Sequence, residues 1–268
     1  MQVSKTRHAS WQELLAAPPP ASHVVQICDS SDFLVAGVAL FAAEGLRAGE
    51  AVLLVGTQAH LLAVRRALST AGADPDAALR AGQLSVSDAH EVAAAVMVDG
   101  HLDPARVDAV AGGTLRKLNA DARFTGVRWW GEVSNLMHEQ GNTPAALAAE
   151  SLGDALTKRL GARLLCTYCL DKFDADAYDG ILKDVCGRHS HAIPTADYVR
   201  HRLAVNRAVA EVIGDIRGPL LQSLLSWKGL GCDLPSSQAL LFWLREAMPE
   251  KFRDVLSRAK AHQLQKVE

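Results

Sequence analysis

Residues Ala51–Gly56 read AVLLVG, an uninterrupted apolar run of strand length. A strand that is apolar at every position is typical of parallel sheets whose two faces are both covered by helices. Other strand-length segments lie at 23–28, 83–88, 127–132 and 163–168, and segments of helical periodicity separate them. This alternation predicts an α/β fold with a mostly parallel sheet sandwiched by helices.

The pattern changes at about Thr195, after which no strand candidate remains. Helical stretches are expected there at about 197–213, 218–227, 236–248 and 250–265. We therefore expect three parts: a loosely attached N-terminal arm at 1–21, an α/β domain at 22–194 and an all-helical extension at 195–268. The extension is expected to dock on a partner, or on a second copy in a homodimer, with packing onto its own sheet as the alternative.

The composition is that of a soluble globular protein, with 49% hydrophobic and 22% charged residues. The formal net charge of -2 gives no field that would hold nucleic acid or anionic lipid. No apolar run approaches the roughly 20 residues that cross a bilayer. The odd number of cysteines, five, does not indicate a disulfide scaffold, so we expect a cytoplasmic protein without direct nucleic-acid or membrane contact.

The turn after the first strand, Cys28–Asp32, has no glycine and no lysine. A phosphate-binding loop needs both, and the carboxylates of Asp29 and Asp32 would repel a polyphosphate. The sequence also lacks the G-x-S-x-G and H-E-x-x-H motifs. These observations disfavour a kinase, hydrolase or dehydrogenase, and we expect a protein without catalytic residues.

Two segments at strand ends are candidate ligand sites, because ligands of such sheets bind beyond the carboxyl ends of the strands. In the segment 128–132, alternation places Arg128, Trp130 and Glu132 on one face and Trp129 on the other. Glu132 would lie at the strand's carboxyl end. An Arg128–Glu132 ion pair is the structural alternative.

The second candidate is the turn Asp29-Ser30-Ser31. Serine and aspartate at this position also cap helices, with a contribution of about 1 kcal/mol. Capping and a ligand role are compatible, so both are expected of this turn.

The cysteines suggest a zinc pattern: Cys166 and Cys169 form C-x2-C, and after sixteen residues Cys186 and His189 form C-x2-H. However, Cys166 and Cys169 would point to opposite faces of a strand. The alternative for Cys166 is a small buried side chain. His23, near the start of the first strand, is expected to be structural.

Several segments taken in order resemble the MEDS family (methanogen/methylotroph DcmR sensory domain) over about residues 22–198. They are His23–Cys28 with the acidic turn, Leu46–Glu50, Gly100–Pro104, Arg128–Glu132, Leu165–Tyr168 and Cys186–His191 with Pro194. The resemblance implies a RecA/KaiC-like fold without its phosphate loop. It also implies a sensory module for small molecules, hydrocarbon derivatives among them, in bacterial or archaeal signalling and transcription control.

The resemblance further implies that the turn around Asp29, together with Arg128, Glu132, Tyr168 and His189, lines the ligand pocket. Two departures are Cys169, where proline or an acidic residue is expected, and the helical extension, which matches no output domain that we can name.

Three functions remain open. The first is a sensor without cofactor, whose small uncharged or cationic ligand binds at the strand ends and is read out through the extension by a signalling partner. The second is a residual nucleotide-binding or acid–base enzyme that uses Glu132 and His189. The third is a zinc or redox switch through Cys166, Cys169, Cys186 and His189.

Overall fold

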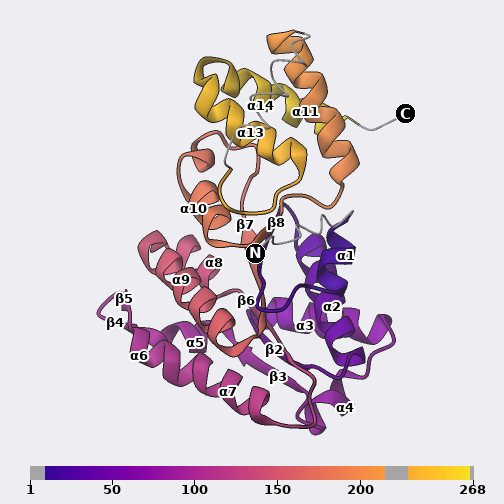
Figure 1. The fold of residues 1–268 in the computed structure, drawn as a ribbon, viewed down its shortest axis with the longest axis vertical. Coiled ribbons are helices and arrows are strands. Elements are labelled where there is room, and N and C mark those ends of the chain that lie inside the picture. Colours follow the sequence, from indigo (N-terminus) through magenta and orange to yellow (C-terminus); the bar gives the residue numbers. More distant parts are fainter. Residues whose placement is uncertain (1–9, 215–228, 266–268) are drawn as a thin grey trace, which may run out of the picture.

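The computed structural model describes residues 10–214 and 229–265, and its centre is a six-stranded parallel sheet (Figure 1). The strand order is β3-β2-β6-β7-β1-β8. The strands are β1 (His23–Cys28), β2 (Ala51–Gly56), β3 (Leu84–Asp88), β6 (Val127–Gly131), β7 (Arg163–Cys169) and β8 (His191–Ile193), and a separate hairpin consists of β4 (Met97–Val98) and β5 (His101–Leu102). The predicted α/β class is confirmed.

Helices cover both faces of the sheet, and the described part of the extension contains three more (Figure 1). One face carries α1 (Trp11–Ala16), α2 (Ser31–Arg47), α3 (Gln58–Thr70) and α4 (Pro75–Arg80). The other carries α5 (Ala89–Val96), α6 (Pro104–Val107), the π-helical η1 (Asp108–Gly112), α7 (Gly113–Ala120), α8 (Val133–Glu139) and α9 (Thr143–Leu160). The 3₁₀ segment η2 (Asp176–Tyr178) and α10 (Ile181–Arg188) lead through β8 to α11 (Tyr198–Ile213), α13 (Ser236–Ala247) and α14 (Pro249–Leu264).

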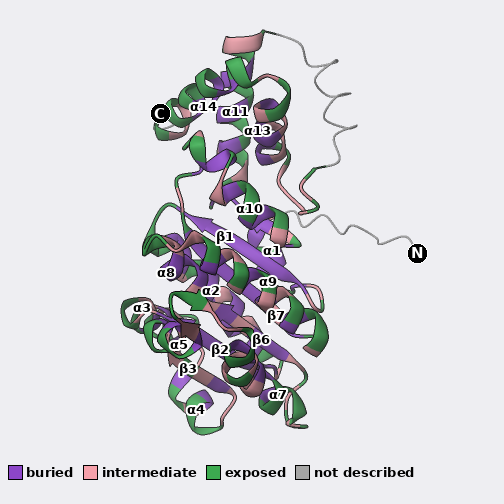
Figure 2. Ribbon diagram, turned by 90° about the vertical axis from the view of Figure 1, so that its left-hand side faces the viewer, coloured by how far each residue is buried: buried purple, intermediate pink, exposed green. Residues whose placement is uncertain are grey.

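The apolar strands form the core, as their sequences predict. All six residues of β1 and all six of β2 are buried, and Figure 2 shows the sheet as a buried layer between helices with exposed outer faces. The five predicted strands are present. The predicted helix at 218–227 lies outside the described residues.

The N-terminal arm is attached more firmly than the sequence suggests. Helix α1 packs on α2, with Leu15 fully buried and Trp11 9% exposed. The Trp11 indole N–H donates to the carbonyl of Ala196, at 2.9 Å. The expectation of a loose arm is therefore wrong for α1, because its apolar residues cover one edge of the core.

A buried ion pair at the amino end of the sheet joins Arg128 of β6 to Glu50. The Arg128 guanidinium also donates to the carbonyls of Leu15 and Phe41, each at 2.9 Å. Gly45 of α2 makes room for this side chain, since a Cβ there would lie 2.6 Å from Arg128 Cδ. Arg128 therefore ties α1 and α2 to the sheet.

Replacing Arg128 with leucine should lower the free energy of unfolding by about 3 kcal/mol. The change leaves the Glu50 carboxylate buried with one remaining cationic partner, Arg163, and removing one member of a buried pair costs about 3–5 kcal/mol. Urea denaturation measures the loss. The control is Arg65→Leu, which breaks the exposed Arg65–Asp76 pair and should change little. Equal effects of the two substitutions would contradict a structural role for Arg128.

The extension packs onto its own sheet domain. Its helices share one buried apolar cluster with β1, β7, β8 and α10, in which Val205, Phe242 and Val255 contribute from α11, α13 and α14. Among the described residues, the apolar stripes of these helices are therefore largely covered within the chain. This arrangement is the alternative that the sequence left open, and docking on a partner or second copy stays a prediction.

His201 of α11 is fully buried in this interface, and its ring centroid lies 5.8 Å from that of Phe173. Burial, with the nearby charge of Lys172, lowers the pKa of His201 to about 4.

Stability should consequently fall as the pH drops through the window from about 6.5 to about 4. In that window the unfolded chain binds a proton at His201 that the folded chain excludes, a difference of about 3 kcal/mol in total. Above pH 6.5 this contribution is fully present. Urea titrations at several pH values should show a shallower acid dependence for His201→Leu than for the parent. The exposed-site variant His101→Asn should keep the parent's dependence, and identical profiles for all three proteins would refute this role of His201.

Candidate functional site

The sequence-predicted ligand residues do not converge on one pocket. Strand alternation, with the parallel register, directs Arg128 and Trp130 to the α1–α4 side, and Trp129 and Tyr168 to the opposite side. The predicted alternation of 128–132 is thus confirmed. The same alternation separates Arg128 from Tyr168 and His189.

Arg128 and Glu132 also do not pair with each other. Arg128 is held by Glu50 at the amino end of the sheet. Glu132 lies just beyond the carboxyl end of β6, where its Oε2 accepts from the Thr57 N–H at 2.8 Å and its Oε1 lies 2.5 Å from His60 Nδ1. Glu132 therefore anchors the start of α3, and the alternative acid–base pair of Glu132 with His189 is not assembled.

The turn after β1 lines an open groove of about 550 Å³ at the carboxyl ends of β1 and β7. Asp29 forms an ion pair with Lys172 at 2.5 Å, and the Ser30 hydroxyl accepts from the Phe33 N–H as the cap of α2. The opposite wall belongs to α14, through Lys260, Gln263 and Leu264. The sequence prediction of a cap is confirmed, and a ligand role for this turn stays a prediction.

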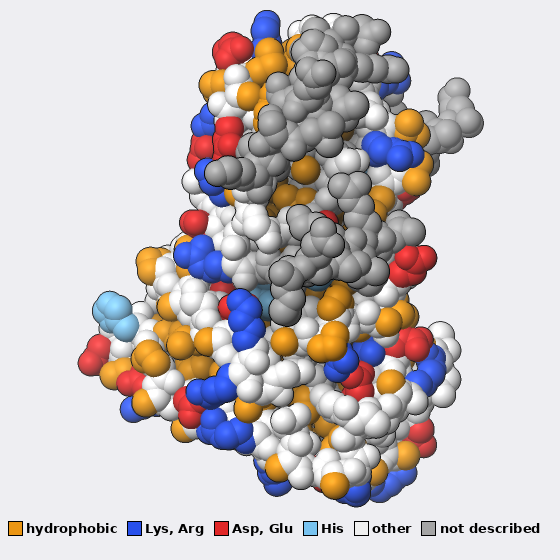
Figure 3. Space-filling view, viewed as in Figure 1, with side chains coloured by type: hydrophobic (Ala, Val, Ile, Leu, Met, Phe, Trp, Pro, Cys, Tyr) orange, Lys and Arg blue, Asp and Glu red, His pale blue; other side chains and the backbone are white. Residues whose placement is uncertain are grey.

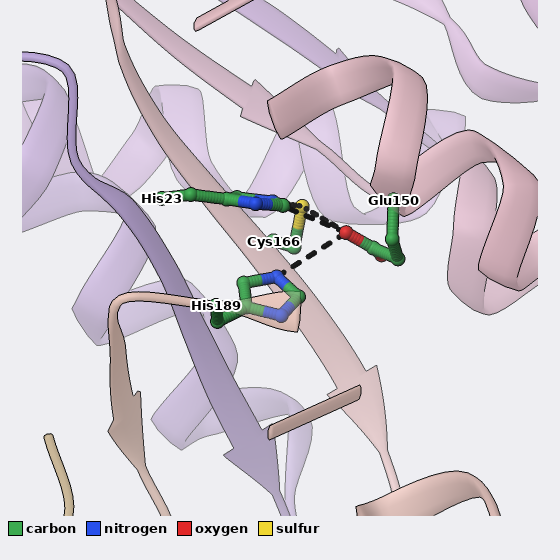
Figure 4. A group of neighbouring side chains, drawn as sticks. All are labelled: His23, Glu150, Cys166 and His189. Atoms are coloured by element: carbon green, nitrogen blue, oxygen red, sulfur yellow. Dashed lines mark hydrogen bonds and ion pairs between the residues drawn. The ribbon is translucent and has the colours of Figure 1, made fainter. Parts of the chain in front are cut away.

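A second concentration of polar groups lies inside the molecule, on the α9 side of the sheet. His23 of β1, Cys166 of β7, Glu150 of α9 and His189, which follows α10, are all buried and point toward one another (Figure 4). One ligand-type atom from each lies within 4.8 Å of the others. Three of these atoms surround Glu150 Oε2: His23 Nε2 at 3.1 Å, His189 Nε2 at 3.2 Å and Cys166 Sγ at 3.3 Å.

Hydrogen bonds outside this cluster hold its members in place. The Tyr168 hydroxyl donates to Glu150 Oε1 at 2.8 Å, and His189 Nδ1 lies 2.7 Å from the carbonyl of Val185. His23 Nδ1 faces Asp154 of α9, 3.7 Å from its Oδ1. Tyr168 and His189, which the family resemblance places in the ligand pocket, therefore both contact Glu150, and a ligand role for them stays a prediction.

The charges of the cluster depend on one another. Burial works to raise the pKa of Glu150, but His189 and His23 lower it well below its ordinary value. Burial works to lower the pKa of His23, whereas Asp154 and Glu150 raise it. Burial and the charge of His23 lower the pKa of His189, and burial with Glu150 raises that of Cys166. The charge state of each of the four residues is therefore coupled to that of the others.

An apolar cavity of about 80 Å³ adjoins this cluster, between the sheet and the helices α5, α6, η1 and α9. Glu150 and Cys166 belong to its wall, and the other polar lining residues are Ser87, Thr114 and Ser134. The remaining lining is apolar: Leu53, Val55, Val92, Val96, Leu102, Val107, Val110, Ala111, Trp129, Gly131, Val133, Ala149, Gly153 and Leu164. The cavity can hold a small uncharged molecule.

The predicted zinc set of Cys166, Cys169, Cys186 and His189 is not assembled. Cys169, three residues after Cys166 on β7, is exposed at the strand end. Cys186 is buried in the apolar cluster beneath the extension, where burial raises the pKa of its thiol to about 12. The residues that do join Cys166 and His189 are His23 and Glu150.

Neither His23 nor Glu150 was selected by the sequence motifs. The sequence did contain a signal for Glu150: it occupies the buried stripe of α9, between Ala146 and Gly153, where a carboxylate is rare unless paired. His23 shares a strand face with Val25 and Ile27, so its burial was predictable but its partner was not.

Comparison with known proteins gave one family. Residues 22–189, well over half of the chain, match the family described as MEDS: MEthanogen/methylotroph, DcmR Sensory domain. The matched range contains β1 to α10 and all four cluster residues. No curated protein and no solved structure matched. In the described ranges, no helix has both the length and the apolar character to span a membrane.

The different environments of the cysteines predict an order of alkylation. Cys169 should react first with iodoacetamide, because it is exposed while Cys28, Cys166 and Cys186 are buried. Its rate should rise with pH later than that of a free cysteine, since partial burial and the carboxylates of nearby glutamates raise the pKa of its thiol. Peptide mass spectrometry over time measures both effects. Cys169→Ser should lose the fast phase, and rapid labelling of Cys166 in the folded protein would contradict the structure.

Proposed function

Because the chain belongs to the MEDS family of sensory domains, we propose that it is a regulatory protein that detects a small uncharged molecule and signals through its helical extension. The ligand binds in the apolar cavity beside Glu150 and Cys166. The presence of that apolar cavity, with Glu150 and Cys166 in its wall, is the observation that carries the proposal.

The size and lining of the cavity limit its ligand. An engineered apolar cavity of roughly 150 Å³ binds benzene, so about 80 Å³ suits a molecule of a few heavy atoms. An apolar lining favours a hydrocarbon-like body, the hydroxyl of Ser134 or Thr114 can donate or accept one hydrogen bond, and the Glu150 carboxylate can accept one. A charged ligand would lose its hydration without a matching partner.

The wall of the cavity connects to the extension through the buried cluster. Glu150 and Cys166 face the cavity, and Glu150 also contacts His189 at 3.2 Å. His189 ends α10 and precedes β8, which leads into α11. A ligand that alters the position of Glu150 therefore acts on the segment that carries the extension. Signalling requires that the ligand bind two arrangements of this segment with different affinities.

The groove after β1 is a second candidate ligand site for the same function. Its specific support is that α14 forms one wall and Asp29-Ser30-Ser31 the other, so that a bound molecule would touch both the sheet domain and the extension.

The surface charge of the protein also agrees with a neutral ligand. Positive and negative side chains are mixed on the face shown in Figure 3, and the formal net charge is -2.

Filling the cavity should abolish ligand binding without unfolding the protein. The probes are uncharged one- to four-carbon alcohols, ketones and halocarbons, together with xenon, which enters dry apolar cavities. Parent protein should show thermal stabilisation by at least one organic probe and a xenon contact shift by nuclear magnetic resonance. Ala111→Leu places a larger side chain in the cavity wall and should lose both effects.

Two variants separate the possible sites. Ala109→Leu adds the same side chain to η1 at an exposed position and should bind as the parent does. Ser31→Trp obstructs the groove and should also leave binding intact. Binding that survives Ala111→Leu but is lost in Ser31→Trp would transfer the site to the groove. The absence of any probe effect on the parent would refute the cavity proposal.

A further inference from the structure

The four cluster residues make a buried donor set in which His189 Nε2 and Glu150 Oε2 face each other. His189 Nδ1 lies 2.7 Å from the carbonyl of Val185, which can only accept, so Nδ1 carries the proton. His189 Nε2 is then the ring atom left to bind a cation, and it faces Glu150 Oε2 at 3.2 Å. His189 Nε2 is buried and has no hydrogen-bond partner within the described residues. A cation between the two atoms, either a proton or a metal ion, satisfies both of them.

The spacing of the donor atoms suits a small tetrahedral cation. Zinc bonds of 2.0–2.3 Å to nitrogen, oxygen and sulfur imply ligand-to-ligand distances of about 3.3–3.7 Å in a tetrahedron. Here, Glu150 Oε2 lies 3.1–3.3 Å from the other three donors, and His23 Nε2 lies 3.3 Å from Cys166 Sγ. The widest separation in the group, within 4.8 Å, would close by about 1 Å, which side-chain rotation can supply.

The surroundings of the donors are those of metal ligands. Histidines that bind metals usually donate their second ring N–H to a carbonyl or carboxylate, and His189 has the carbonyl of Val185 in this position. His23 Nδ1 faces the Asp154 carboxylate at 3.7 Å, slightly beyond hydrogen-bond distance. The Glu150 carboxylate is oriented by a further hydrogen bond from Tyr168. The two imidazole rings lie with centroids 3.8 Å apart, which brings both Nε2 atoms toward the same point.

We propose that His23, Glu150, Cys166 and His189 bind one Zn²⁺ ion in a closed, tetrahedral site. Mixed nitrogen, sulfur and oxygen donors suit zinc, whereas magnesium and calcium prefer oxygen alone. One carboxylate and one thiolate neutralise the charge of the ion, so the buried site as a whole is neutral. Cys166 binds the ion as a thiolate, so binding releases its thiol proton to solvent.

This site does not depend on the proposed sensory function. It ties β1, β7, α9 and the end of α10 together, and four protein ligands leave no position for a substrate. It also differs from the cysteine-rich set suggested by the sequence, since Cys169 and Cys186 are not members.

The experiment measures metal content and cobalt spectra of the full chain, prepared without a polyhistidine tag. Protein from zinc-supplemented cells, after dialysis, should contain one zinc per chain by elemental analysis. After chelator treatment, Co²⁺ should give intense d–d bands typical of tetrahedral coordination and a thiolate-to-cobalt charge-transfer band in the ultraviolet.

Matched variants identify the ligands. Cys166→Ser should abolish the charge-transfer band, and His23→Gln should weaken the tetrahedral d–d bands. Cys169→Ser and Cys186→Ser should leave both features unchanged. The zinc content and the cobalt spectrum of the parent protein test the proposed site even where a variant fails to fold.

Three results would overturn the proposal. Parent protein that binds neither zinc nor cobalt contains only a hydrogen-bonded histidine–glutamate cluster. Weak d–d bands without charge transfer indicate adventitious surface binding. Loss or weakening of the charge-transfer band in Cys169→Ser or Cys186→Ser, as well as in Cys166→Ser, assigns the metal to the cysteine-rich set.

Discussion

The structure depends on a charge that is kept inside the protein. Glu150 is 1% exposed, and an isolated carboxylate at such a depth would be protonated or would destabilise the fold. Its oxygens are instead surrounded by Tyr168, Cys166, His23 and His189. Because these partners come from β1, β7 and the end of α10, the requirement to compensate one carboxylate fixes how α9 and α10 lie on the sheet. A metal cation or a shared proton can compensate the Glu150 carboxylate equally well. We therefore expect the metal-bound and metal-free protein to have the same fold.

Much of the architecture could be predicted because it follows from local patterns. Continuous apolar runs such as Ala51–Gly56 predict buried parallel strands, and the alternation of 128–132 predicts which side of the sheet each side chain faces. Short elements could not be predicted in this way. β8 has only three residues and the hairpin strands two each, too few for a periodicity to be visible, and they form because neighbouring backbone groups need partners.

The site was less predictable because its residues are distant in sequence. The spacing of Cys166 and Cys169 suggested a pair of ligands, but pleating sends the two side chains to opposite faces. Arg128 has a charged side chain of the kind that often binds ligands. Its guanidinium is instead bound by Glu50 and by backbone carbonyls. His23 meets Cys166 only because β1 and β7 are adjacent and in register, and no pattern within either segment contains that information.

The π-helical turn η1 in the cavity wall has a mechanical consequence. A π turn holds one residue more than an α turn, and such turns are rare and less favourable than regular helix. If η1 tightened into α-helix, the surplus residue would have to move along the chain, turning α7 relative to α6 by about 100° and sliding it about 1.5 Å. Val110 and Ala111 would then leave their present places in the wall. Such a change of winding would couple the shape of the interior cavity to the rotation of the surface helix α7.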